Sequence, residues 1–476
     1  MSIPSILVHS CPCPLSITML FTTWTFIIFF VVFATGFWLL RRRENARLVW
    51  LLVGSYVFYG WMDVRFLLPL WVTTIVDYTA GRGIARGRHR KLFLALSLVV
   101  NIGILCTFKY LNFFTENLQW LIDTIGWDIE LPESELLLPV GISFYTFQSL
   151  SYTLGVYRKN TRVETSLLRY AAFVAMFPQI LAGPIERARN MLPQLRHIPL
   201  IRCQEITDGL SLIIVGLFKK MVMADMLGIY VDMVYDDLSM YSSLSVLLAA
   251  FFYSWQIYFD FSGYSDMARG VARMIGFRLM LNFNNPYAAV DIRDFWRRWH
   301  ISLSTWFRDH VYIPMGGSRC GKYRVWWNVM VTMVVSGLWH GAAWNFIIWG
   351  ALNGVGSILS PRAGQSSWYG KVPRLFQQLA TFLFITMTWV FFRTGATGEA
   401  LAVLRRCISF EAGTTLIPVI PLFLTLLAWG WMLLYDSAQQ NFLNRRAVRL
   451  AALTVMLLLI FLLGGGSHEQ FIYFQF

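Results

Sequence analysis

Two histidines lie in sequence surroundings that favour chemistry. His300 belongs to the string Asp-Phe-Trp-Arg-Arg-Trp-His-Ile-Ser, and His340 belongs to Ser-Gly-Leu-Trp-His-Gly inside an uncharged stretch, 326–361. Hydrocarbon disfavours a charged imidazole and cannot hydrogen-bond its ring nitrogens, so a histidine there usually has a function. A neutral, buried imidazole suits general-base catalysis, such as deprotonating a hydroxyl that attacks a thioester. The pair predicts an acyl-transfer site embedded in a membrane.

The residues alone also allow plainer roles. His340 could be a structural residue bonded to a neighbouring helix carbonyl, and its position does not separate this role from catalysis. His300 falls on an amphipathic segment, where a histidine is often a surface residue; in a functional role it would orient an acyl donor or stabilise an oxyanion. His310 follows close behind, which weakens the case for one essential histidine in this region.

Basic residues surround His300. They could neutralise the phosphates of a coenzyme A head group at a cytoplasmic opening, although ordinary charge at a membrane boundary explains them equally well. The nearby segment 258–266 carries two carboxylates without a metal-ligand spacing, so it favours polar packing, and we expect no metal. The sequence has no Walker loop, zinc pattern or Gly-x-Ser-x-Gly elbow. The basic set is Arg293, Arg297, Arg298, Arg308, Lys322 and Arg324.

The elements that hold these residues are predicted to be membrane helices. The chain is 57% hydrophobic and 14% charged, against roughly 45–50% and 25% for a soluble domain. A spanning helix needs about 20 largely apolar residues. Uncharged runs near that length recur, which indicates an all-α polytopic membrane protein; they are 21–40, 136–157, 241–259, 375–392, 412–435 and 450–467.

The placement of charge argues against nucleic-acid binding, despite a net charge of +14. Basic residues gather in the short loops at 41–43 and 82–91, whereas 111–137 carries acidic residues and no Lys or Arg. This asymmetry is the positive-inside signature, so the basic loops should be cytoplasmic and 111–137 should form an outer loop. The six cysteines show no metal or disulfide spacing and are expected to be unpaired thiols.

Alternating these loop charges predicts about eleven or twelve crossings plus re-entrant pieces. Segment 171–185 is short and contains two prolines, which favours a broken, re-entrant helix. Segment 292–310 is amphipathic and suits a helix at the interface. The stretch 326–361 is too long for one span and should bend near Gly337 and Gly341.

We expect a single integral domain over 19–476. Residues 1–18 show no secretory signal and are expected to be a dispensable extension, either untranslated or disordered, with translation starting at Met19.

The ordered strings of this chain resemble the membrane-bound O-acyltransferase family, in particular its bacterial alginate O-acetylation branch. The string 295–306 contains His300, and Gly-Leu-Trp-His-Gly at 337–341 contains His340. The other matching strings are Leu-Pro-Val-Gly-Ile-Ser-Phe-Tyr (138–145), Phe-Pro-Gln-Ile-Leu-Ala-Gly-Pro-Ile (177–185), Tyr-Phe-Asp-Phe-Ser-Gly-Tyr-Ser-Asp-Met-Ala (258–268) and the terminal Phe-Ile-Tyr-Phe-Gln-Phe.

The resemblance implies a ring of helices around a central funnel or tunnel, with His340 and His300 as the family's two key histidines. Related systems end in Phe-x-Tyr-x-x-Phe, whose tyrosine is proposed to accept the acyl group, so Tyr473 is a candidate acceptor; an aromatic interfacial anchor is the alternative. Family members usually carry Tyr where this chain has His310, so no role transfers to it. Further candidate contacts for substrate or CoA are Arg297, Arg298, Trp299, Trp339, Gln179 and Asp266.

The resemblance also implies a function: acetyl would pass from cytoplasmic acetyl-CoA, as a substrate rather than a resident cofactor, across a bacterial inner membrane. A periplasmic acetyltransferase would then O-acetylate an exopolysaccharide such as alginate, or another extracytoplasmic glycan. Two alternatives are a proton-coupled transporter or channel, and a family member that acts on another acyl group or acceptor. A purified transferase would hydrolyse acetyl-CoA or become acetylated, whereas a transporter would do neither.

Overall fold

The computed structural model describes residues 19–464 and 471–472, except 133, 182, 198, 200, 361–368 and 435–445. Helices make up most of this part of the chain, and its only β pairing is an isolated bridge between Tyr241 and Thr414. The predicted extension 1–18 and Tyr473 lie outside the described residues.

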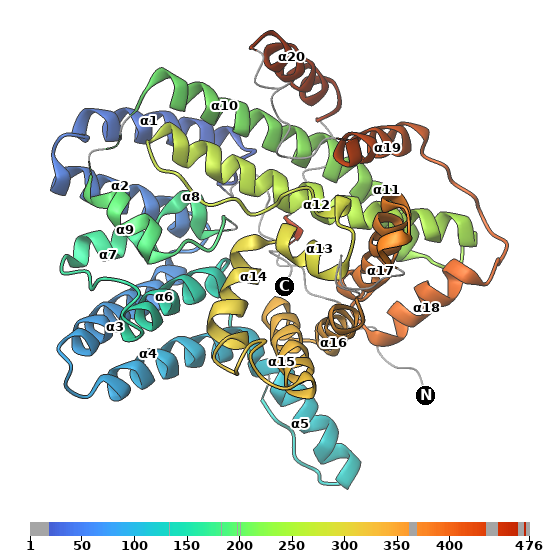
Figure 1. Cartoon of the computed structure of the whole chain (residues 1–476), viewed down its shortest axis with the longest axis horizontal. Helices are drawn as coiled ribbons and strands as arrows, with labels where there is room; N and C mark the ends of the chain where they lie inside the picture. Colours follow the sequence, from blue (N-terminus) through green and yellow to red (C-terminus); the bar gives the residue numbers. More distant parts are fainter. Residues whose placement is uncertain are drawn as a thin grey trace.

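The N-terminal helices lie on one side of the molecule (Figure 1). The 3-10 helix η1 spans Val64–Phe66, and the π-helix η2 (Cys106–Tyr110) joins α4 to α5 without a break. The α-helices are α1 (Trp24–Leu40), α2 (Glu44–Gly60), α3 (Leu67–Ala85), α4 (Arg90–Leu105), α5 (Leu111–Ile125), α6 (Ile142–Tyr157), α7 (Leu167–Val174), α8 (Phe177–Ile180) and α9 (Ala188–Arg196).

A long central helix crosses the molecule beside the short helices that carry His300 (Figure 1). The π-helices here are η3 (Phe218–Ala224) and η5 (Arg308–Tyr312), and Pro286–Ala288 forms the 3-10 helix η4. The α-helices are α10 (Cys203–Leu217), α11 (Asp225–Asp236), α12 (Ser243–Met274), α13 (Ile292–Arg298) and α14 (Ile301–Phe307).

The C-terminal helices complete the opposite side, and the last described residues return to the middle of the view, near α13 (Figure 1). A 3-10 helix, η6, spans Tyr369–Lys371. The α-helices are α15 (Lys322–His340), α16 (Trp344–Leu359), α17 (Arg374–Arg393), α18 (Thr397–Ile408), α19 (Val419–Leu434) and α20 (Arg446–Leu463).

Four stretches of helix are long and apolar enough to cross a bilayer: Arg90–Ile125, Ser243–Met274, Arg374–Arg393 and Arg446–Leu463. Large apolar side chains on their outer faces and on α1 are exposed, among them Trp24, Ile28 and Phe461. Such faces fit a lipid surround rather than water. The chain is therefore an all-helical membrane protein, as predicted, while the total of eleven or twelve crossings stays a prediction.

Several boundaries differ from expectation. Residues 111–125, predicted as loop, continue the α4 helix as α5, and α12 runs fifteen residues past the predicted end at 259. The single amphipathic helix expected at 292–310 is instead two short helices broken at Trp299 and His300, both buried.

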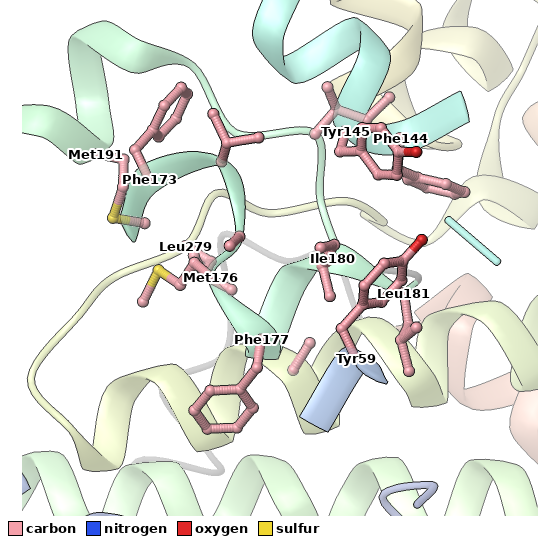
Figure 2. Packing of buried hydrophobic residues seen from close by; sticks show 14 of the residues in the cluster. Tyr59, Phe144, Tyr145, Phe173, Met176, Phe177, Ile180, Leu181, Met191 and Leu279 are labelled. Atoms are coloured by element: carbon pink, nitrogen blue, oxygen red, sulfur yellow. The ribbon is translucent and has the colours of Figure 1, made fainter. Parts of the chain in front are cut away.

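Two predicted breaks are confirmed. The stretch 326–361 divides between α15 and α16 at residues 341–343, and 171–185 divides between α7 and α8. Figure 2 shows buried side chains packed around this second break, including Phe173, Met176 and Phe177. The buried side chains of the described residues form two hydrophobic clusters, one centred on the N-terminal helices and the other on α12, α16 and α17.

Candidate active site

His340 is the last residue of α15, and the helix stops there because Gly341 is fully extended. Aromatic rings surround its imidazole: Trp349 and Phe392 lie edge-on, with ring centroids 5.1 Å and 5.2 Å away. The side chain is 4% exposed. This apolar shell disfavours the charged form, so the imidazole is suited to accept a proton only transiently.

The end of α15 is held by a lysine from another helix. Lys109, in η2, donates from Nζ to the carbonyl oxygens of Trp339 and His340, each at 2.8 Å, and the Tyr110 hydroxyl donates to the Leu338 carbonyl at 2.7 Å. The last carbonyls of a helix lack partners within the helix and carry partial negative charge, so the half-buried ammonium of Lys109 is favourable there. Lys109 and Tyr110 therefore hold the C-terminal end of α15, and with it the backbone of His340, in place.

His300 faces His340 from the break between α13 and α14. The two ring centroids are 6.4 Å apart. His300 is fully buried, with Phe261 edge-on at 4.6 Å and Phe144 at 6.2 Å. Its backbone is left-handed, with φ 41° and ψ 55°, a conformation that costs energy for a residue other than glycine. Such strain often marks a functional position.

A small cavity opens beside His340. Its volume is about 30 Å³, enough for one or two waters. His340, Trp339 and Lys109 line one part of it, and residues 138–144, which include the string Leu-Pro-Val-Gly-Ile-Ser-Phe, line the other. Residue 340 therefore borders a small open space, although its side chain is packed among aromatic rings.

A larger cavity lies along α15 on the side of its N-terminal turns. It has a volume of about 400 Å³ and reaches Ser336, one helical turn before His340. Arg293, Arg297 and Arg308 line it together with Trp296. Three of the predicted basic residues thus gather at one cavity, whereas Arg298, Lys322 and Arg324 do not line it.

A second basic cavity, of about 520 Å³, shares Arg308 with the first. In it the Arg187 and Arg158 guanidinium groups face the two ring nitrogens of His310, at 2.8 Å and 3.4 Å. Burial, followed by these two positive charges, lowers the pKa of His310 to about 4. His310 is therefore neutral at physiological pH and lies away from the His300–His340 pair.

The other predicted site residues lie in different surroundings. Arg298 pairs with Asp294 at 3.0 Å, and Asp266 pairs with Lys219 at 2.7 Å. Trp299 is buried against Trp389, and the Gln179 amide donates to the Phe173 carbonyl. These four residues line none of the three cavities described above. Trp339 does adjoin the pair, with its ring 4.9 Å from His340.

Sequence reasoning missed three contributors. They are Lys109, Phe144 and Phe261. Lys109 is a lone lysine in the apolar stretch that follows α4, and the two phenylalanines lie in strings noted only for their resemblance. An ionisable residue inside an apolar helix is itself a signal of function, so Lys109 could have been found. The two phenylalanines carry no such signal.

Comparison with known proteins shows which family the sequence matches. The protein-family model described as MBOAT, membrane-bound O-acyltransferase family, matches residues 86–393, which include both histidines. A probable alginate O-acetylase of Pseudomonas aeruginosa is 40% identical over 79% of this chain and 72% of its own length. A probable alginate O-acetylase of Pseudomonas putida is 34% identical over 96% of this chain and 100% of its own length. A peptidoglycan O-acetyltransferase of Helicobacter pylori is 34% identical over 81% of this chain and 79% of its own length.

Proposed function

The chain belongs to the membrane-bound O-acyltransferase family and is an acyltransferase, and from that premise we propose that it carries acetyl from cytoplasmic acetyl-CoA through a bacterial inner membrane. The acetyl would serve O-acetylation of an extracytoplasmic glycan. The similar proteins named as O-acetylases of alginate and peptidoglycan support acetyl as the group and a polysaccharide as its destination.

The observation that carries the proposal is a small cavity beside His340 together with a basic cavity that ends one helical turn earlier along α15, at Ser336. The cavity lined by Arg293, Arg297 and Arg308 offers cationic groups for phosphates and reaches Ser336. The thioester of a donor bound there would have to extend one further helical turn along α15 to meet the imidazole. The small cavity gives the same imidazole access for a hydroxyl. Donor and acceptor would thus meet at one proton acceptor.

In this mechanism His340 accepts the acceptor's hydroxyl proton as that oxygen attacks the thioester carbonyl carbon. The new carbon–oxygen bond forms, the carbon–sulfur bond breaks, and the imidazolium returns the proton to the departing thiolate. His300, across from His340, would orient the thioester or stabilise the oxyanion. The acceptor would be the Tyr473 hydroxyl, which would pass acetyl to a periplasmic acetyltransferase, or a hydroxyl of that partner.

The test is turnover of acetyl-CoA by purified protein. Replacing His340 by alanine should lower CoA release and acetyl transfer by at least about 100-fold, because a positioned general base contributes roughly that much or more. His89→Asn is the matched control, since His89 is exposed in a loop with a left-handed backbone that asparagine tolerates. Unchanged turnover in His340→Ala would remove the catalytic assignment, and proton flux without acetyl-CoA turnover would favour a transporter.

A further inference from the structure

A buried ion cluster lies beside α12 and has no role in the chemistry above. Lys220 Nζ is 2.8 Å from a carboxylate oxygen of Asp225 and 2.8 Å from one of Asp260. The side chains of Lys220 and Asp260 are 8% and 1% exposed. One ammonium between two carboxylates leaves a negative charge inside the protein, which is costly unless further donors bind it.

The further donor belongs to the end of the chain. The second carboxylate oxygen of Asp260 accepts the backbone N–H of Ile472 at 2.8 Å. A hydrogen bond to an ionised acceptor is stronger than one between two neutral groups. Because the donor is a backbone group, the bond holds the path of the chain at 472 whatever side chain stands there.

The same part of α12 also packs against Phe471, the residue before Ile472, and contacts His300. The ring of Phe471 stacks on Tyr264, with centroids 4.6 Å apart, and lies 5.8 Å from Phe261. Phe261 also lies edge-on to His300 at 4.6 Å. Phe471 belongs to one hydrophobic cluster and Ile472 to the other, so these two residues lie where the two clusters meet.

We propose that Asp260 is a positioning residue, which together with Lys220 and Asp225 anchors the chain end beside His300 and so delivers Tyr473 to the histidine pair. A terminal segment normally frays unless it is tied down, and this one is tied by a charge-assisted hydrogen bond and a ring stack. Tyr473 follows Ile472 directly, so fixing Ile472 fixes where the next residue begins. The inference rests on the proposed role of Tyr473 as acetyl acceptor.

The anchor is tested by trimming the full-length, detergent-purified chain with a broad-specificity carboxypeptidase and following its intact mass. Asp260→Ala removes the acceptor and leaves a neutral Lys220–Asp225 pair, so the helices should stay folded, as checked by thermal unfolding. Trimming past Ile472 should be about tenfold faster than in the wild type, the size expected for losing a hydrogen bond to a charged group. Asp260→Asn, which keeps a neutral oxygen, should be intermediate.

The matched control is Glu205→Gln. Glu205 is a half-buried carboxylate of α10 that also pairs with a cation of α12, Arg273, at 2.7 Å, and it pairs with Arg278 at 2.6 Å. The Glu205→Gln variant should be trimmed at the wild-type rate. Equal trimming of wild type and Asp260→Ala would overturn the anchor.

Delivery of Tyr473 is tested separately with radioactive acetyl-CoA. Two quantities are compared: the acetyl found on the C-terminal peptide, and the total CoA released, which includes hydrolysis of acetyl-CoA by water. In Asp260→Ala, acetylation of Tyr473 should fall at least about tenfold further than CoA release. A purely structural role would lower both to the same extent, and that result would overturn the positioning role. A wild-type chain end that never carries acetyl, with trimming still dependent on Asp260, would instead refute the proposed acceptor and with it the delivery.

Discussion

At the scale of single residues, the left-handed backbone of His300 predicts that a glycine variant is more stable than an alanine variant, the reverse of the usual order. Glycine in a helix or strand is normally less stable than alanine, by roughly 0.5–1 kcal/mol. At φ 41° the order should reverse, because alanine meets the left-handed penalty of about 1 kcal/mol that glycine escapes. His300→Gly should therefore unfold at a higher temperature than His300→Ala.

Both variants should lose turnover to the same extent, because both lack the imidazole. The measurement is the thermal unfolding midpoint of each protein in one detergent, together with acetyl-CoA turnover. A more stable alanine variant would show that the break between α13 and α14 is not left-handed at 300, and a glycine variant with wild-type turnover would exclude a chemical role for His300.

Single residues also show how far sequence reasoning reached. Both histidines were predicted from their strings and are brought within 6.4 Å of each other. The grouping of Arg293, Arg297 and Arg308 at one cavity was only one of two open interpretations. Asp266 and Arg298 were predicted to contact substrate or CoA, yet each forms an ion pair within the protein, Arg298 with its helix neighbour Asp294 and Asp266 with Lys219. A partner 47 residues away, such as Lys219 for Asp266, leaves no local pattern.

At the scale of elements, α15 reaches its position by close packing on α16. A Cβ atom added at Gly350 would lie 2.4 Å from the Met333 carbonyl oxygen, and one at Gly337 would lie 2.1 Å from that of Phe346. Small residues at the contact between two helices let their backbones approach closely in membranes. Because the opposing atoms are backbone, they cannot move aside as a flexible side chain would.

Gly350→Ala should therefore separate α15 from α16 and displace His340, even though residue 350 lies outside the cavities. We expect turnover to fall at least about tenfold, because small displacements of catalytic groups are costly, and the unfolding midpoint should also fall. Gly103→Ala is the control: no atom lies within 4 Å of its added Cβ, and alanine is the better helix former in α4. Wild-type turnover in Gly350→Ala would show that the packing is looser than the structure indicates.

Elements were predicted best where glycine or proline interrupts an apolar run, as between α15 and α16 and between α7 and α8. They were predicted worst where a charge appeared to end a span. Asp260 stopped the expected span at 259, but Lys220 and Ile472 satisfy its carboxylate inside the protein and α12 continues to Met274. Long-range pairing of this kind is a property of the fold and does not show in a hydropathy pattern.

At the scale of the whole molecule, the proposed function requires that the two ends of the reaction path face different compartments. The positive-inside rule places the loop at 86–89 in the cytoplasm and the loop after α5 outside. Arg88 and Asp128 are both exposed in these loops. The helix from Arg90 to Ile125 joins them, and its 36 residues would be about 54 Å long if straight, more than a hydrocarbon core of about 30 Å requires.

Single cysteines at Arg88 and Asp128, in a chain whose six native cysteines are replaced by serine or alanine, should therefore react from opposite sides. In intact spheroplasts, a membrane-impermeant maleimide should label Asp128→Cys and leave Arg88→Cys unlabelled; in inverted vesicles the pattern should reverse. Acetyl-CoA turnover of each variant checks that the fold is kept. Labelling of both positions from one side would break the link between charge and compartment, and donor and acceptor would then have to reach His340 from the same side.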